Sequence, residues 1–295
     1  MLFNRIAIVG LGLIGGSFAL AARRAGIART ITGCGTSESI EYALAHKVID
    51  EVETAFYDGT ESDADLVYLA TPVRAIIDFL RTRARQIKPG AIITDAGSTK
   101  REICLAARES LTRDSLAEKI FFIGGHPMAG SHRTGIESAS ADIFQNAPYA
   151  VVPDGVGDSS DRNYTASVSA LIDTVRAIGS RPILVNAARH DSTVAWVSHM
   201  PQLLSTALAV AVARKAESCE LAGTGFADMT RLAASSWSVW EDVCRTNADE
   251  ISAALGEVIL EIEAIRHGLA EGRFSTLAQA FEEANEFSRD PARRA

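Results

Sequence analysis

Three glycines near the start of the chain have the spacing of a nucleotide-binding loop. Gly10, Gly12 and Gly15 form a GxGxxG sequence that follows the apolar run RIAIV and opens an alanine-rich, helix-like segment. In a strand, loop and helix of this kind, the first glycine permits a tight turn, the second lets the backbone approach a pyrophosphate, and the third lets helix and strand pack closely. The helix start then attracts the anion. We therefore expect a dinucleotide site rather than a plain glycine turn, with Leu13 and Ile14 in its loop.

The turn after the second expected strand bears on the choice of dinucleotide. Sites that prefer NAD usually carry an acidic residue about 20 residues beyond the glycine loop, where it binds the ribose 2′-hydroxyl. Here Gly35 takes that place, and Thr36 and Ser37 follow it with hydroxyls that can donate to a 2′-phosphate. No arginine lies in this turn, and Glu38 is positioned to reverse the preference. We expect an NAD(P) site with NADP slightly favoured.

Three later apolar runs also end in turns with polar or glycine residues. Ligands of open parallel sheets bind outside the carboxyl ends of the strands, so these turns are expected to line the site. Thr71 and Pro72 follow one run and are expected to contact the cofactor, Ser98 lies in DAGSTK, and His126 lies in GGHPMAGS. His126 has glycines beside it that leave room for a ligand, and an imidazole titrates near neutrality. From position alone, a general base and a buried structural histidine are equally good interpretations.

Five segments together resemble one enzyme family. GLGLIGGS, DAGSTK and GGHPMAGS, followed by HDSTVAWVSHMPQ and FADMTR, are similar in order to the prephenate/arogenate dehydrogenases of tyrosine biosynthesis, from about residue 5 to about residue 245. The resemblance implies an α/β dinucleotide-binding domain of modified Rossmann type, followed by an all-α domain through which two chains form a homodimer. It also implies oxidative decarboxylation of prephenate to 4-hydroxyphenylpyruvate, or of arogenate to tyrosine, with hydride transfer to NAD(P)+.

The resemblance also implies roles for single residues. His126 is similar to the catalytic histidine that hydrogen-bonds the ring C4 hydroxyl, and Ser98 to the serine that orients this histidine beside the nicotinamide. Four residues are similar to substrate-binding positions, namely a loop hydroxyl, a histidine, an arginine that holds a carboxylate and an aromatic wall: Ser131, His199, Arg231 and Trp240. The family often has a second histidine where this chain has Gln202, so we assign that position no role.

Ordinary structural interpretations stay open for several of these residues. Arg231 can form a surface ion pair with Asp228 or Glu241, His199 can be a satisfied core histidine, and Trp240 can simply pack. The other histidines have no partner signal in the sequence and are expected at the surface or in loops: His46, His132, His190 and His267.

The arrangement of apolar runs predicts two domains. Strand-like runs alternate with helix-like segments as far as RPILVNA, which predicts a parallel sheet with helices on both faces over residues 1–187. Residues 188–295 show helical patterns alone, and the best of them has apolar residues at 3.6-residue spacing over 251–269.

Composition excludes several classes of protein. The net charge of −8 gives no electrostatic basis for binding nucleic acid. The four cysteines have no metal-ligand spacing, so we expect reduced thiols in a cytoplasmic protein and no metal. Residues 192–213 lack charges, but their polar side chains and a proline favour a buried helix over a membrane span. The apolar start superficially resembles a signal peptide, although the glycine loop explains its spacing better.

Two other functions remain open at this stage. A different two-domain hydroxyacid dehydrogenase usually needs a catalytic lysine in its helical half, where this chain has only Lys215. A regulator that senses nucleotide without catalysis is the second alternative. The sequence does not decide between prephenate and arogenate, or whether tyrosine inhibits the enzyme.

Overall fold

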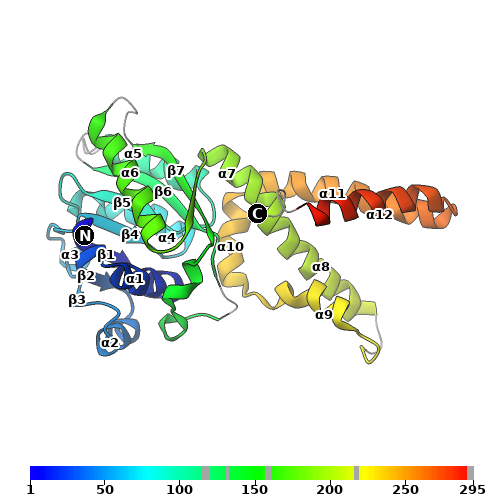
Figure 1. Ribbon diagram of the computed structural model, residues 1–295, viewed down its shortest axis with the longest axis horizontal. Helices are drawn as coiled ribbons and strands as arrows, with labels where there is room; N and C mark the ends of the chain where they lie inside the picture. Colours follow the sequence, from blue (N-terminus) through cyan, green and yellow to red (C-terminus); the bar gives the residue numbers. More distant parts are fainter. Residues whose placement is uncertain (114–119, 131–132, 157–160, 216–218, 291–295) are drawn as a thin grey trace.

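An eight-stranded sheet with helices on both faces forms one end of the molecule, and helices alone form the other (Figure 1). The computed structural model describes residues 1–113, 120–130, 133–156, 161–215 and 219–290. The strands are β1 (Phe3–Val9), β2 (Ala28–Cys34), β3 (Glu51–Val52), β4 (Leu66–Leu69), β5 (Ile92–Asp95), β6 (Phe121–Pro127), β7 (Pro148–Val156) and β8 (Arg181–Leu184).

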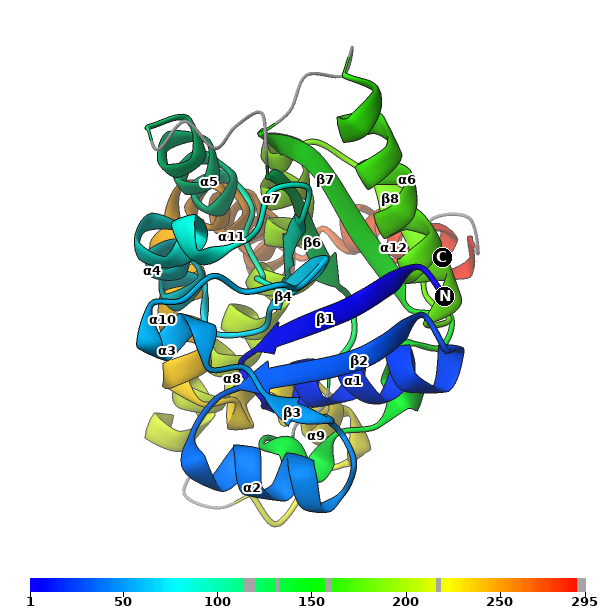
Figure 2. The same cartoon turned by 90° about the vertical axis from the view of Figure 1, so that its left-hand side faces the viewer.

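The sheet is sandwiched between two hydrophobic cores. Neighbouring residues of β4 point to opposite faces: Val67 packs with Ile76 and Ile103, which lie in helices on one side, whereas Tyr68 packs with Phe18, which lies in a helix on the other. A strand buried on both faces needs an unbroken apolar run, as LVYL is here. Figure 2 shows the helices on either side of the sheet: α1 (Leu13–Ala25), α2 (Ser37–Ala45), α3 (Ala55–Asp58), α4 (Val73–Arg83), α5 (Arg101–Arg113) and α6 (Arg162–Ala177). Short 3₁₀ turns lie at Ala84–Gln86, Ile136–Ser138 and Ala141–Phe144.

The strand order is β3-β2-β1-β4-β5-β6-β7-β8. The expectation of a wholly parallel sheet is wrong at one place, because β6 and β7 are antiparallel, with His126 opposite Ala150. The described part of the connection between these two strands contains only 3₁₀ turns, so no helix carries the chain back to the other edge of the sheet. The strands β1, β4, β5 and β6 are parallel, and their carboxyl ends therefore lie at one edge.

The second part of the chain is helical. It contains α7 (Ala187–Val194), a π turn (Ala195–His199), α8 (Met200–Lys215), α9 (Thr224–Thr230), a 3₁₀ turn (Arg231–Ala234), α10 (Trp237–Thr246), α11 (Ala248–Ala270) and α12 (Phe274–Arg289). β8 ends at Leu184 and α7 begins at Ala187, and we keep the division at residue 187 as a proposal.

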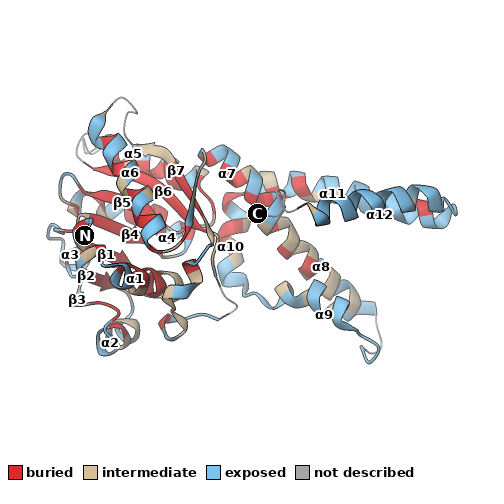
Figure 3. Ribbon diagram, viewed as in Figure 1, coloured by how far each residue is buried: buried red, intermediate tan, exposed pale blue. Residues whose placement is uncertain are grey.

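Much of the helical part exposes apolar side chains. Figure 3 shows α11 and α12 as mostly exposed. Leu260 is 60% exposed and Phe281 is 75% exposed, because the helical part has only a small buried core around Ala195, Val243 and Ile251. Apolar surface on this scale is typical of a protein–protein interface. The continuous helix Ala187–Lys215 is also long and apolar enough to cross a membrane. Its buried polar side chains instead bond to other parts of the chain: His190 and Asp191 to the nucleotide-binding part, and His199 and Gln202 within the helical part.

Two carboxylates from the helical part cap helices of the nucleotide-binding part. Asp242 of α10 accepts the backbone N–H of Arg74 at 3.0 Å and also pairs with the Arg74 side chain. Asp191 of α7 accepts the backbone N–H groups of Lys100 and Arg101 at 2.7 and 2.9 Å. Such caps satisfy N–H groups that have no partner within the helix and stabilise it by about 1 kcal/mol each. The two parts are therefore joined at the starts of α4 and α5, directly after the strand-end loops.

Candidate active site

The glycine loop between β1 and α1 has the geometry that each expected role requires. Gly10 has φ +99°, and a Cβ atom there would lie 2.7 Å from the Ala70 carbonyl oxygen. A Cβ atom on Gly15 would lie 2.0 Å from the Gly10 carbonyl oxygen, so helix and strand pack closely there. Around Gly12 the space is open within 4 Å, and no side chain of the described residues caps the start of α1. The loop therefore leaves room, and unpaired N–H groups, for a pyrophosphate.

A cleft of about 590 Å³ continues from this loop. Of the residues expected to bind the cofactor, it is lined by Gly10, Gly12, Thr36, Thr71 and Pro72. The remaining four do not line the cleft: Leu13, Ile14, Gly15 and Ser37. A second cavity of about 270 Å³ shares some of its lining, and the two together suit an extended dinucleotide.

The start of α2 forms the side of the cleft where a ribose would lie. Thr36 is the N-cap, and its hydroxyl accepts the backbone N–H of Ser39 at 3.3 Å. A Cβ atom on Gly35 would lie 2.7 Å from the Ser39 hydroxyl, so this turn is closely packed without a carboxylate. Glu38 lines the same cleft. Hydroxyls and one carboxylate therefore both face the region that would distinguish NADP from NAD.

A fully buried ion pair joins the ends of β5 and β6. The Lys100 ammonium pairs with the Asp95 carboxylate and also donates to the Gly125 carbonyl at 2.8 Å. Asp95 in turn accepts the backbone N–H of Gly125 at 3.0 Å. Buried charges persist when they are paired and hydrogen-bonded, as both are here. The backbone N–H and the carbonyl of Gly125, the residue before His126, are therefore both held in place.

His126 lies at the end of β6, beside a second histidine. Its side chain is buried but 8% exposed, so it is not sealed from the site. Its Nδ1 atom lies 2.9 Å from Nε2 of His190, and Nδ1 of His190 lies 2.7 Å from Oδ1 of Asp191. The expectation that His190 lies at the surface or in a loop is wrong. It is 3% exposed, because α7 packs against the end of β6.

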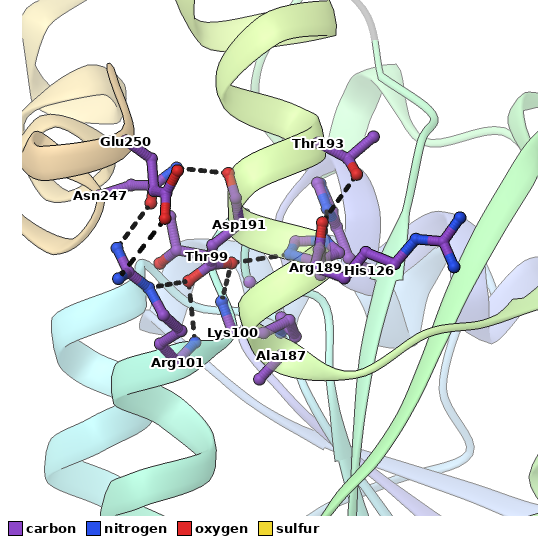
Figure 4. Close-up of polar contacts among 12 residues, drawn as sticks. Thr99, Lys100, Arg101, His126, Ala187, Arg189, Asp191, Thr193, Asn247 and Glu250 are labelled. Carbon is purple, nitrogen blue, oxygen red and sulfur yellow. Dashed lines mark hydrogen bonds and ion pairs between the residues drawn. The ribbon is translucent and has the colours of Figure 1, made fainter. Parts of the chain in front are cut away.

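Asp191 is at the centre of this arrangement (Figure 4). Besides His190, its carboxylate accepts the backbone N–H groups of Lys100 and Arg101, and the Arg101 side chain lies 3.4 Å away. Burial raises the pKa of Asp191, but the hydrogen bond from His190 and those from the backbone outweigh it, and the pKa lies below its ordinary value. Asp191 is therefore ionised at neutral pH.

His126 is neutral at physiological pH. Burial lowers its pKa well below the ordinary value, and the electrostatic effects of His190, the Lys100 ammonium and His199 act in the same direction. An unprotonated imidazole has a lone pair with which to accept a proton. The site therefore presents a neutral base at the sheet edge where the glycine loop lies.

The helical part brings His199 and Trp240 together. The π turn Ala195–His199 ends two residues before Pro201, which has no N–H to continue the regular helix. The His199 ring lies edge-on to Trp240 with centroids 5.9 Å apart, and its Nδ1 lies 3.2 Å from the side-chain amide of Asn247. Burial is the largest influence on His199 and lowers its pKa to about 4. His199 is thus a satisfied, neutral histidine near His126.

Arg231 begins the 3₁₀ turn that follows α9. Its side chain is exposed and forms no ion pair in the part of the chain that the structure describes. Glu241, one of the alternative partners, pairs with Arg245 at 3.0 Å. Gln202, to which we assigned no role, holds this turn to α8 by donating to the Leu232 carbonyl at 2.7 Å.

The structure places neither of the two predicted site serines against His126 by a hydrogen bond between described residues. Ser98 is half-buried in the loop after β5, and no hydrogen bond between described residues joins it to His126. Ser131 lies outside the described residues. The structure thus brings His126 and His199 into one region. It places Ser98 in the loop after β5 and Arg231 in the 3₁₀ turn after α9, and no hydrogen bond between described residues joins either of them to these histidines.

The sequence patterns did not single out the buried residues beside His126. His190 and Asp191 are adjacent in the segment HDSTVAWVSHMPQ, and Lys100 ends DAGSTK, so all three lie inside segments already singled out. A histidine next to an aspartate at a helix start was the available signal, but the strand that they approach is 64 residues away in sequence.

A dinucleotide-type glycine loop and a neutral imidazole at the same sheet edge define an oxidoreductase of the NAD(P)-dependent class. The family model "Prephenate dehydrogenase, nucleotide-binding domain" matches residues 18–179, and "Prephenate dehydrogenase, dimerization domain" matches residues 186–283. The chain belongs to the prephenate dehydrogenase family.

Individual relatives agree with this assignment. The prephenate dehydrogenase of Bacillus subtilis is 32% identical over 291 residues, which cover 96% of this chain and 75% of that protein. The cyclohexadienyl dehydrogenase of Zymomonas mobilis is 29% identical, with 95% and 94% covered. The crystal structure of Synechocystis arogenate dehydrogenase has a TM-score of 0.78 and 27% identity, with 96% and 98% covered. Prephenate dehydrogenase from A. aeolicus, solved with hydroxyphenyl propionate and NAD+, shares the fold with a TM-score of 0.84, 24% identity and 96% of each chain covered.

The glycine geometry predicts opposite outcomes for two alanine variants. Gly12→Ala should fold normally but weaken NAD(P) binding about tenfold or more, because its Cβ atom fills space that faces the ligand. Gly15→Ala should lose about 1–3 kcal/mol of unfolding free energy, because its Cβ atom overlaps the Gly10 carbonyl. Urea denaturation and calorimetric titration measure the two effects. Wild-type cofactor affinity in Gly12→Ala would show that the pyrophosphate lies elsewhere.

The buried histidines predict a loss of stability in mild acid. The pKa of His199 is about 4 in the folded protein and near 6.5 in the unfolded chain, so the unfolded state binds more protons between these values. The unfolding free energy should therefore fall by about 3 kcal/mol from pH 6.5 to pH 4, with His126 adding a loss of the same sign. Denaturation across this range measures the loss, and His199→Gln should reduce it. A flat profile in the wild type would contradict the assignment.

Proposed function

We propose that this protein oxidatively decarboxylates prephenate or arogenate, with NAD(P)+ as hydride acceptor, in tyrosine biosynthesis. The observation that carries the proposal is the neutral His126 imidazole at the end of β6, at the edge where the glycine loop opens. The relatives named prephenate, cyclohexadienyl and arogenate dehydrogenase support this substrate class.

The chemistry requires a base beside the ring C4 hydroxyl. Bound NAD(P)+ supplies the hydride acceptor. As hydride leaves C4, the hydroxyl on the same carbon loses its proton, and His126 accepts it. The ring carboxylate leaves as carbon dioxide, and the electron pair of the broken C–C bond makes the ring aromatic and passes to the C4 oxygen. That oxygen takes a proton back from the protonated His126 to give the phenol. The product is 4-hydroxyphenylpyruvate from prephenate, or tyrosine from arogenate. Because the ring becomes aromatic, the reaction is effectively irreversible.

The other site residues bind and orient in this proposal. Ser98 orients His126, and Arg231 holds a substrate carboxylate with a guanidinium that no acid in the described chain occupies. A charge-assisted hydrogen bond of this kind contributes about 1.5–3 kcal/mol. The remaining substrate-binding residues are Ser131, His199 and Trp240. The cofactor is held by Gly10, Gly12, Leu13, Ile14, Gly15, Thr36, Ser37, Thr71 and Pro72.

We infer that either dinucleotide binds and that NADP is slightly favoured. The absence of a carboxylate at Gly35 supports this preference, as does the hydroxyl of Thr36, which lines the cleft. Ser37, which does not line it, is retained from the sequence of the turn. Glu38, which lines the same cleft, opposes it by repelling a 2′-phosphate.

We also propose a cytoplasmic homodimer that binds neither membrane nor nucleic acid. The uncovered apolar side chains of α11 and α12 and the match to a dimerization domain support the dimer. A hydroxyacid dehydrogenase with a catalytic lysine is less well supported. Lys215 is exposed at the end of α8, and the Lys100 ammonium is committed to Asp95.

Supplying each substrate with each dinucleotide, and following reduced nicotinamide, tests the proposal directly. Turnover with prephenate or arogenate should fall about 10²- to 10⁴-fold in His126→Asn, because no base then takes the hydroxyl proton. Cofactor affinity should change less than about threefold, since His126 lies outside the glycine loop. Unchanged turnover would show that another group moves the proton. Absence of activity with both substrates in the wild type would defeat the proposed function.

Removal of the Arg231 guanidinium should chiefly weaken substrate binding. Arg231→Ala is expected to raise the Michaelis constant for substrate about 10-fold or more, with a smaller change in turnover, because the lost interaction is made in the ground state and transition state alike. Arg231→Lys keeps the charge but not the bidentate geometry of the guanidinium. Its Michaelis constant should lie between those of the wild type and Arg231→Ala. Steady-state kinetics measure both variants. A wild-type Michaelis constant in Arg231→Ala would remove its anchoring role.

A further inference from the structure

We propose that His190 and Asp191 are positioning residues, which hold the His126 imidazole in the tautomer that has its proton on Nδ1 and its lone pair on Nε2. This inference rests on the proposed function for its catalytic meaning, but the tautomer itself is a property of the free protein. Three residues from two parts of the molecule form a single chain of hydrogen bonds, from His126 through His190 to Asp191.

The positions of the protons follow from the last member of the chain. A carboxylate only accepts, so the hydrogen bond of 2.7 Å between Nδ1 of His190 and Oδ1 of Asp191 places a proton on that nitrogen. In this proposal His190 carries this one ring proton, which leaves its lone pair on Nε2. That atom lies 2.9 Å from Nδ1 of His126 and accepts a proton from it. The lone pair of a neutral His126 is thereby placed on Nε2, which is the atom left to meet the substrate.

The surroundings of Asp191 keep it a carboxylate. Its Oδ1 atom accepts from His190 and from the backbone N–H of Lys100, and its Oδ2 atom accepts the backbone N–H of Arg101. A protonated acid would place a hydrogen against one of these donors. The side-chain amide of Asn247 also bonds to the Asp191 backbone carbonyl at 2.9 Å, which fixes the residue from its other side.

Other charged and titratable groups surround His126, and they bear on any pH profile. From the loop after β5 come the Lys100 ammonium and its partner Asp95. From the helical part come His190, Asp191 and His199. Arg101 faces Asp191 rather than the imidazole. No hydrogen bond between described residues joins the buried Asp95–Lys100 pair to His190. A change in the pH profile of a His190 variant therefore reflects the loss of His190 itself, through its hydrogen bond to His126 or its electrostatic effect on it.

The base and the residues that orient it belong to different parts of the molecule. His126 lies in the sheet, whereas His190 and Asp191 lie on α7. The active tautomer is therefore set only where α7 meets the start of α5. The arrangement resembles in principle the aspartate of a serine-protease triad, which orients a histidine without taking its proton.

Two substitutions of His190 separate positioning from packing. His190→Phe keeps a planar ring but removes the acceptor, so both tautomers of His126 should become populated. Turnover should fall about 10²-fold with little change in the Michaelis constant. His190→Gln retains a side-chain oxygen that can accept from Nδ1 of His126, and it should recover turnover to within about tenfold of wild type.

Nitrogen-15 NMR of the histidine rings reads the tautomer directly, and a chain with six histidines is suited to assignment. Wild-type His126 should show a protonated Nδ1 and an unprotonated Nε2, and His190→Phe should show a mixture. The same tautomer in both proteins, or equal turnover in both, would overturn the proposal. Activity lost in His126→Asn but kept in His190→Phe would leave the proposed function standing and remove the positioning role. If the wild type held the single tautomer but was inactive on both substrates, the hydrogen-bonded chain would stand and the proposed function would be removed.

Asp191→Asn provides a second test, with a matched control. Either orientation of the new amide sets an N–H group against a backbone N–H or against the ring of His190, so the tautomer should be lost and turnover should fall about 10²- to 10⁴-fold. Asp242 also caps a helix across the same junction but touches no histidine. Asp242→Asn should lose comparable thermal stability with turnover within about threefold of wild type and an unchanged pH profile. Equal loss of turnover in both variants would assign the effect to the junction instead.

Discussion

A buried carboxylate that must be fully hydrogen-bonded organises the centre of this molecule. Asp191 is sealed from solvent, where an unpaired carboxylate would be strongly destabilising. Its donors are the backbone N–H groups at the start of α5 and the ring N–H of its neighbour His190. The first set joins the helical part to the sheet, and the second reaches His126. One charge therefore fixes both the junction between the two parts and the orientation of the base.

The same surroundings determine what kind of base His126 can be. Burial and the nearby Lys100 ammonium keep it unprotonated, but a lower pKa also makes it a weaker proton acceptor. A weak base suffices for the proposed reaction, because departure of hydride turns the C4 hydroxyl into a strongly acidic group on its way to a carbonyl. The surroundings of His126 thus favour a high fraction of unprotonated imidazole over a high proton affinity.

Local sequence patterns predicted the parts of the structure that depend on local physics. The glycine loop, the buried strands and the long helix over 251–269 follow from spacing and periodicity. His126 is singled out by its place at the end of an apolar run, which leaves a base and a structural histidine as equally good interpretations, and it lies near the end of β6. The antiparallel pairing of β7 was not predictable, because it depends on a connection without a crossing helix. His190 was misjudged for a related reason, since only the packing of α7 against β6 makes its buried position visible.

The helix Ala187–Lys215 shows how one apolar segment serves two surfaces. The wide turn at Ala195–His199 keeps His199 on the side that carries Asp191, and Asn247 accordingly bonds to both residues. On the other side Trp196 and Val197 remain exposed. In the proposed homodimer, a second copy that covers these side chains would hold the very turn from which His199 projects. A segment apolar enough to be mistaken for a membrane span therefore has two faces: a polar face that bonds to the rest of the chain, and an exposed apolar face that the proposed homodimer would cover.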